Sequence, residues 1–248
     1  MLTSVRSLVA AAIVAGAGFA AAPAMAQDSD FSLSANTAIV SEYRFRGVDY
    51  SGGDIAIQGG VDLSHSSGIY IGTWGSSLDE DTVGYGHTEL DLYGGWSGNL
   101  TDTVSVDVGA IYYVYPNAPD APGVDYDYIE MYGSVGFAMG PASATVGVAY
   151  APEQNSLGDN DNLYVYTDLG LGVPNTPVSL SAHLGYTDGN FLTYTNDGNA
   201  FDWSIGADYA LTQNISVGVS YVAAEGDYAP GAYDFTDDAV VATLSASF

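Results

Sequence analysis

The chain has 248 residues, of which 30 are acidic and only 3 are Lys or Arg, and its formal net charge is −27. This balance excludes nucleic acid as a partner, because contacts to phosphates require Lys and Arg. The lack of cysteine excludes disulfides and thiol chemistry. The 20 Tyr, 8 Phe and 3 Trp argue against a disordered acidic chain, since disordered segments are poor in aromatic residues.

Residues 1–26 have the features of a cleaved secretory signal peptide. Arg6 supplies positive charge, an apolar run extends from Leu8 to Ala22, and Ala24-Met25-Ala26 is an A-x-A cleavage site. The alternative is an N-terminal membrane anchor, which the clear processing site and the shortness of the run disfavour. We therefore expect an exported protein whose fold is one domain, residues 27–248.

Apolar residues alternate with small or polar residues along the rest of the chain, and this pattern predicts about twelve strands of one antiparallel transmembrane β-barrel. The first predicted strand covers Phe31 to Arg46, with Tyr43 and Phe45 facing outward. The second lies around residues 55–63, the third covers 68–77, and the last covers 240–248. The eight strands between them are marked by the outward residues Leu90, Val106, Val135, Val146, Val165, Leu180, Ile205 and Val217.

The connections between these strands alternate in length. Tight turns such as Gly98–Thr101 and Gly140-Pro141 alternate with connections of about ten residues or more that carry Asp, Asn, Gly and Pro. Outer-membrane barrels have short periplasmic turns and longer extracellular loops, and an even strand number places both termini in the periplasm. We therefore expect a bacterial outer-membrane protein that contacts lipid, and whose C-terminal strand is recognised by the outer-membrane insertion machinery.

Aromatic residues are expected to form two girdles at the membrane–water interfaces, as is typical of such barrels. The predicted girdle residues are Tyr112, Tyr150, Tyr186 and Tyr221 at the outer interface, and Trp96, Tyr209 and Phe248 at the periplasmic interface.

Acidic residues on the strands share the inward parity, and none is predicted to face lipid. The predicted lumen charge cluster comprises Glu42, Arg44, Arg46, Glu89, Asp91, Glu130, Asp168 and Asp202, and Asp54, Asp62, Asp107 and Asp208 are assigned to the same face. One interpretation is a constriction whose transverse field filters solutes. The other is a structural cluster in which the two arginines bind Glu42, Glu89 and Asp91 and hold the first four strands together. Both interpretations can hold at once.

Catalysis, cofactors and metal binding have little support in the sequence. His65, His87 and His183 are scattered, and no G-x-S-x-G motif or EF-hand spacing is present. Ser181 and His183 share the inward face, but two residues along a strand separate side chains by about 7 Å, beyond hydrogen-bond reach. The acidic loops at residues 79–81 and 159–161 are expected to be solvated. We predict no enzyme, no cofactor and no metal site.

The chain contains the segment Ser41-Glu42-Tyr43-Arg44-Phe45-Arg46-Gly47 and the segments 58–62, 67–76 and 89–96. Together these four segments resemble the TorF-type porins, also known as the Gcw_chp family, of proteobacterial outer membranes. The motif residues are Tyr43, Phe45, Arg46, Gly47, Tyr70, Gly72, Trp74, Glu89, Asp91 and Tyr93. The resemblance is dense over residues 31–97, and it implies a barrel with a transport role and no established substrate.

Two functions are therefore open. The first is a passive channel for small hydrophilic solutes or ions that prefers cations, because rings of carboxylates lower the barrier for cations. The second is a closed barrel with a structural or surface-interaction role. Barrels of about eight strands are filled by side chains, and those of sixteen to eighteen strands hold a water channel. A count of twelve strands therefore does not decide whether the lumen is open. Inward glycines favour an opening, whereas inward tyrosines such as Tyr113, Tyr115, Tyr132, Tyr164 and Tyr166 favour a filled lumen.

Overall fold

The computed structural model describes residues 30–120, 125–189, 195–228 and 235–248, so the predicted signal peptide lies outside the described residues. Among them, no helix is long and apolar enough to cross a membrane. The strands that build the barrel are β1 (Phe31–Val40), β4 (Ala56–His65), β5 (Ile69–Ser77), β6 (Thr88–Asn99), β7 (Val104–Val114), β8 (Tyr128–Met139), β9 (Ala142–Gln154), β10 (Asn160–Gly172), β11 (Val178–Asp188), β12 (Thr195–Ala210), β13 (Ile215–Tyr228) and β14 (Ala239–Ser247).

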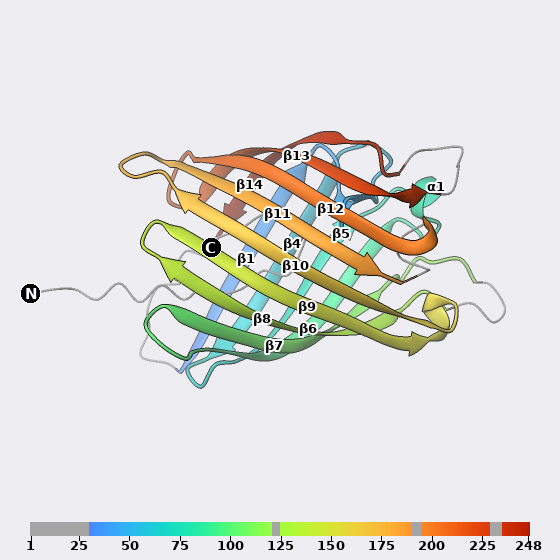
Figure 1. Cartoon of the computed structure of the whole chain (residues 1–248), viewed down its shortest axis with the longest axis horizontal. Helices are drawn as coiled ribbons and strands as arrows, with labels where there is room; N and C mark the ends of the chain where they lie inside the picture. Colours follow the sequence, from blue (N-terminus) through green and yellow to red (C-terminus); the bar gives the residue numbers. More distant parts are fainter. Residues whose placement is uncertain (1–29, 121–124, 190–194, 229–234) are drawn as a thin grey trace, which may run out of the picture.

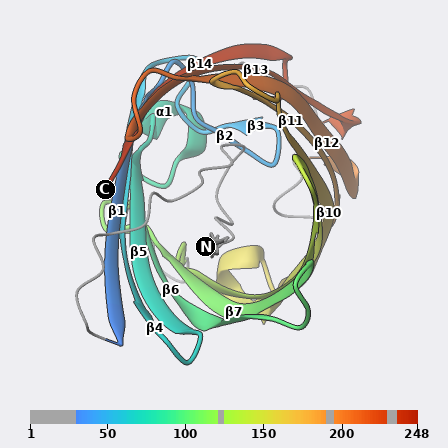
Figure 2. The same cartoon turned by 90° about the vertical axis from the view of Figure 1, so that its left-hand side faces the viewer.

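These twelve strands form one closed antiparallel barrel (Figures 1 and 2). Each strand pairs with the next barrel strand in the chain, and β1 closes the barrel by pairing with β14, with Ile39 opposite Leu244. The predicted all-β fold, a single antiparallel barrel, is confirmed.

The barrel has its apolar side chains on the outside. On β14, Val240 is 65% exposed, whereas Ser245, on the opposite parity, is 4% exposed. The same alternation occurs on β8, where Met131 and Phe137 are exposed and Glu130 is buried. Leaving a whole belt of apolar side chains in water would be costly, and their solvent is therefore lipid. The fold and this belt are those of an outer-membrane barrel, as predicted.

The two ends of the barrel differ. Short turns, residues 66–68, 100–103, 140–141, 173–177 and 211–214, lie at the end that holds the first residue of β1 and the last of β14. Longer connections lie at the other end, with α1 (Glu80–Val83) and the 3-10 turn η1 (Asn155–Leu157) (Figure 1). By the rule for outer-membrane barrels, the short turns are periplasmic and the longer loops are extracellular.

Some strands extend farther at the extracellular end than predicted. The connection from β9 to β10 comprises only residues 155–159, and β12 begins at Thr195, where a loop was expected. The alternation of apolar residues reports contact with lipid, and it stops at the membrane boundary. Backbone pairing between strands continues beyond that boundary, so the hydrophobic pattern underestimates strand length.

The first predicted strand is wrong in its last part. Strand β1 ends at Val40, and residues 41–55, called the plug segment below, turn into the lumen. The segment contains a small hairpin, β2 (Arg44–Phe45) and β3 (Val48–Asp49). Arg46 and Gly47, with φ of 50° and 80°, form its two-residue turn, which is the type I′ geometry that favours glycine. Tyr43 and Phe45 therefore lie inside the barrel, and Tyr43 is only 1% exposed.

Candidate functional site in the barrel lumen

The plug segment crosses the lumen and contacts the far wall. The Tyr43 hydroxyl donates to Oε1 of Glu89 on β6 at 2.8 Å. Phe45 contacts β7, since its ring centroid lies 5.9 Å from that of Tyr113 on this strand. Gly47 lies against β12 and β13, since a Cβ added there would be 2.7 Å from Cβ of Ala224. Figure 2 shows β2 and β3 inside the ring of strands.

Arg46, at the tip of the hairpin, is the main polar anchor of the plug segment. Its Nη2 donates to both carboxylate oxygens of Glu130 on β8, at 2.8 and 2.7 Å. Its guanidinium carbon also lies 4.1 Å from the ring centroid of Tyr164 on β10 and 4.8 Å from that of Phe45. Glu130 is 1% exposed. Breaking such a buried pair costs about 3–5 kcal/mol, so the contact holds the tip firmly.

Arg44 stabilises the base of the plug segment. It forms an ion pair with Glu42 and donates from Nη1 to the carbonyl oxygens of Gly47 and Phe235, each at 3.1 Å. Burial raises the pKa of the Glu42 carboxyl, while Arg44 acts in the opposite direction. Arg44 therefore joins the hairpin to the residues that precede β14.

An aromatic core surrounds the plug segment at the extracellular end. Tyr50 and Tyr85 have ring centroids 6.2 Å apart, and Tyr85 and Tyr115 5.1 Å apart. Leu78 and Leu157 come from two different loops and are buried in the same cluster. Loops and plug segment together place a hydrophobic core inside this half of the lumen.

The periplasmic half of the lumen has a different lining. Its inward residues are mainly Ser and Gly together with carboxylates, and the side chain of Asp168 is 49% exposed although it faces inward. Tyrosine hydroxyls donate to two of the carboxylates, from Tyr93 to Asp62 at 2.5 Å and from Tyr70 to Asp107 at 2.7 Å. This half is therefore acidic, and at Asp168 it is open to solvent.

His183 on β11 joins the two neighbouring strands in this acidic region. Its Nδ1 lies 2.6 Å from Asp168 on β10, and its Nε2 lies 2.9 Å from Asp202 on β12 and 2.8 Å from the Tyr164 hydroxyl. Both ring nitrogens are thus engaged, and the structure gives no pairing with Ser181 among the residues it describes. The cluster supports the Tyr164 ring on which Arg46 rests.

A family model and solved structures match this chain. The model described as a bacterial protein of unknown function (Gcw_chp) matches residues 24–248. The chain belongs to the Gcw_chp family. The NanC porin has a TM-score of 0.59 at 11% identity, with 88% of this chain and 99% of that chain covered. A KdgM porin in complex with disordered oligogalacturonate has a TM-score of 0.57 at 5% identity, covering 87% and 98% of the two chains. Comparison with curated protein sequences finds no match. At these identities the likeness shows a shared fold.

In this Gcw_chp barrel the predicted lumen charges divide between the wall and the plug segment. Glu89, Asp91, Glu130, Asp168 and Asp202 lie on the barrel wall and face inward, whereas Glu42, Arg44 and Arg46 belong to the plug segment. The expected cluster joining the first four strands does not form, because Arg46 reaches across the lumen to Glu130 and Arg44 pairs with Glu42. Arg44 and Arg46 lie in the lumen as predicted, but strand parity gave the wrong partners because both belong to an inner hairpin and not to a barrel strand.

Two acids of the plug segment were also misassigned. Asp54, expected on the inner face of a strand, is an exposed turn residue. Asp49, which is not among the predicted inward acids, is fully buried and accepts hydrogen bonds from the backbone N–H of Ser51 at 2.8 Å and of Gly53 at 2.7 Å. The signal was present in the sequence, because an Asp shortly before Ser51, Gly52 and Gly53 is typical of a turn closed by the Asp side chain.

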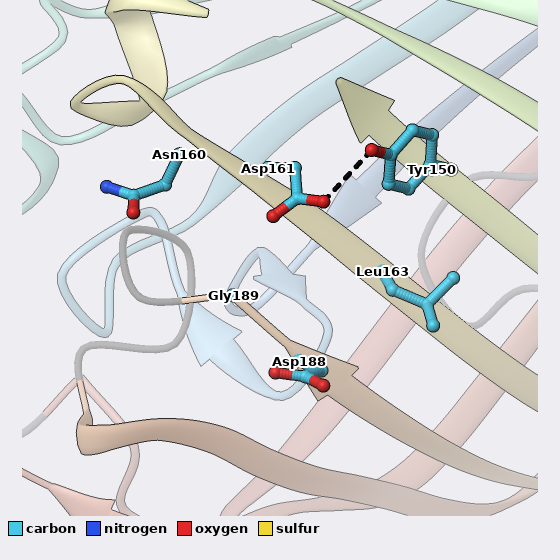
Figure 3. Close-up of a pocket in the computed structure, with 6 residues that line it drawn as sticks. All are labelled: Tyr150, Asn160, Asp161, Leu163, Asp188 and Gly189. Carbon is cyan, nitrogen blue, oxygen red and sulfur yellow. Dashed lines mark hydrogen bonds between the residues drawn. The ribbon is translucent and has the colours of Figure 1, made fainter. Parts of the chain in front are cut away.

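The predicted girdle residues lie on the outward parity of their strands, with Tyr112, Tyr150, Trp96, Tyr209 and Phe248 exposed and Tyr186 and Tyr221 partly exposed. The hydroxyl of Tyr150 donates to Asp161 at 2.9 Å, at a pocket also lined by Asn160, Leu163, Asp188 and Gly189 (Figure 3). Asp161 was expected in a loop, and Asp188 was not among the predicted strand acids. They lie on the outward parity of extended strands, on the extracellular side of the tyrosines.

Proposed function

We propose that this Gcw_chp barrel is an outer-membrane channel for small hydrophilic solutes that prefers cations, and that the plug segment obstructs its extracellular end. The observation that carries the proposal is the wet, acid-lined half of the lumen beneath the plug segment. A barrel with a purely structural role has no need of a half-exposed inward carboxylate such as that of Asp168. The transport role implied by the TorF-type resemblance, and export through residues 1–26, belong to the same proposal.

The charges inside the barrel support cations as the preferred solutes. Both arginines are held in ion pairs, Arg44 with Glu42 and Arg46 with Glu130, so neither is free to attract anions. The carboxylates of Asp62, Asp107 and Asp208 face the same lumen. The KdgM porin was solved with oligogalacturonate, an anionic sugar polymer, and the acidic lining makes that class of solute a poor match for this chain.

The alternative is a closed barrel with a structural or surface-interaction role. The aromatic core around Tyr50, Tyr85 and Tyr115 favours it, because such a core resembles the interior of a folded domain more than a water-filled passage.

Single-channel recording in planar bilayers separates the two functions. We expect small or rare conductance from the native barrel, and larger, cation-selective conductance when residues 44–49 are replaced by a short Gly-Ser linker. A barrel with the Asp102→Asn substitution on a periplasmic turn serves as the charge-change control and should behave like the native protein. Absence of conductance after removal of the hairpin would support the closed barrel.

A further inference from the structure

Asp91 on β6 is a buried carboxyl group on the inward face of the barrel. The residue is 1% exposed, and neither carboxylate oxygen has a hydrogen-bond partner among the residues that the structure describes. Its cross-strand neighbours are Trp74 on β5 and Tyr113 on β7. The Tyr113 hydroxyl donates to Glu130, at 3.2 Å. Glu89 precedes Asp91 by two residues on the same inward face and is also buried.

Neither of the two arginines that the structure describes pairs with Asp91. Arg46 is occupied by Glu130, and Arg44 by Glu42. Glu89 accepts from the hydroxyls of Tyr43 at 2.8 Å and Tyr115 at 3.2 Å, which are neutral donors. Burying two ionised carboxylates on one inward face without a compensating positive charge is strongly unfavourable in a protein interior.

We propose that a small monovalent cation of the Na⁺ or K⁺ class binds between Glu89 and Asp91, at the base of the plug segment. A proton on Asp91 is the competing occupant, since it also offsets one of the two charges, and the experiment below distinguishes it from a cation. A divalent ion is disfavoured, because Ca²⁺ takes six to eight oxygen ligands and no group of three or more Asp, Glu or His side chains among the described residues is arranged to hold a metal.

The site would couple the ion to the plug segment. Glu89 accepts a hydrogen bond from the Tyr43 hydroxyl of the plug segment, so a cation that offsets one of the two charges of the Glu89–Asp91 pair also stabilises that contact. The inference concerns the folded barrel and does not depend on conductance, so it can fail while the channel proposal stands.

Thermal unfolding of the folded full-length barrel in a non-ionic detergent tests the site. Choline chloride is replaced stepwise by NaCl or KCl at constant ionic strength, and we expect Tm to rise by several degrees and then saturate. Asp91→Asn should remove this dependence, because a neutral amide needs no cation. Asp208→Asn, which removes a half-buried lumen acid elsewhere, should retain it.

A measurement on the unmodified protein guards against a variant that does not fold. The ²³Na NMR signal should broaden on addition of the native barrel and sharpen again when K⁺ competes. A Tm that is equal in choline, Na⁺ and K⁺ would overturn the proposal. A Tm that responds to pH but to none of these cations would show that a proton occupies the pair, which also overturns it.

Discussion

Replacing Arg46 by alanine should release the plug segment from the barrel wall. In the native structure, Arg46 donates to both oxygens of Glu130 and stacks on Tyr164. The variant leaves Glu130 buried without its charged partner whenever the plug segment stays in place. When the plug segment moves away, water reaches Glu130 and this penalty disappears. The variant therefore destabilises the docked arrangement specifically.

The size of the effect follows from the burial of the pair. The side chains of Arg46 and Glu130 are 9% and 1% exposed, so the range for breaking a buried ion pair applies, about 3–5 kcal/mol. The lower end is appropriate here, because Glu130 keeps the Tyr113 hydroxyl as a donor at 3.2 Å. About 3 kcal/mol corresponds to a shift of roughly 100-fold in the docking equilibrium, at 1.4 kcal/mol for each factor of ten.

Cysteine labelling measures this equilibrium directly, because the chain has no cysteine of its own. Val48 lies in the hairpin and is buried, so a Val48→Cys variant should react slowly with a maleimide reagent. The labelling rate follows the open population when closing is fast compared with labelling. We expect Arg46→Ala to raise it roughly 100-fold, in proportion to the equilibrium shift estimated from the buried pair. Arg46→Lys should give a smaller increase.

Two controls make the result interpretable. A Thr101→Cys variant on an exposed periplasmic turn should label at the same rate with and without Arg46→Ala. In a Glu130→Gln background, Arg46→Ala should raise the labelling rate of Val48→Cys only a little further, because the effects of substituting two partners of one ion pair are not additive. An unchanged labelling rate at Val48→Cys after loss of Arg46 would refute the role of Arg46 as the anchor.

Three further predictions concern the channel, the wall and assembly. If the barrel conducts, its reversal potential should show a cation preference that weakens as salt rises, since the Debye length falls from about 30 Å at 0.01 M to about 3 Å at 1 M. Neutralising both Arg44 and Arg46 should deepen that preference, and anion selectivity of the native barrel at low salt would contradict the electrostatic argument. Gly147→Ala should lower Tm and reduce the free energy of unfolding by about 1–3 kcal/mol, because its Cβ would lie 2.2 Å from a Tyr166 ring atom. Gly172→Ala, whose Cβ would lie 3.8 Å from its nearest atom, should leave Tm unchanged, and equal Tm values for the two variants would count against this packing. Deleting Phe248 should reduce the level of the protein in the outer membrane of cells without preventing folding in detergent, and normal levels would argue against recognition of the C-terminal strand.

Much of the barrel could be predicted because lipid imposes a period of two on the strands it surrounds. The outward parity of Met131 and Val240 and the inward parity of Asp91 and Asp168 all follow from this single constraint. The pattern needs no knowledge of which strands are neighbours, and for that reason a sequence alone was sufficient.

The plug segment could not be found in the same way. A hairpin inside the lumen has the same period as a strand in the wall, so Tyr43 and Phe45 fit both positions equally well. The clue is the Arg46-Gly47 pair, which forms a tight turn, yet nothing local shows that the turn points inward. The pairing of Arg46 with Glu130 joins residues 84 positions apart, and it depends on where β8 lies across the lumen.

The most direct test of the central claim compares the native barrel with the variant in which a short linker replaces residues 44–49. The quantities measured are the conductance and the reversal potential of each. Across a salt gradient in which both solutions are dilute, we predict little conductance from the native barrel and a large, cation-selective conductance from the variant. A folded variant that conducts no better than the native barrel, or that selects anions, would contradict the claim that the plug segment obstructs a wet, acidic channel.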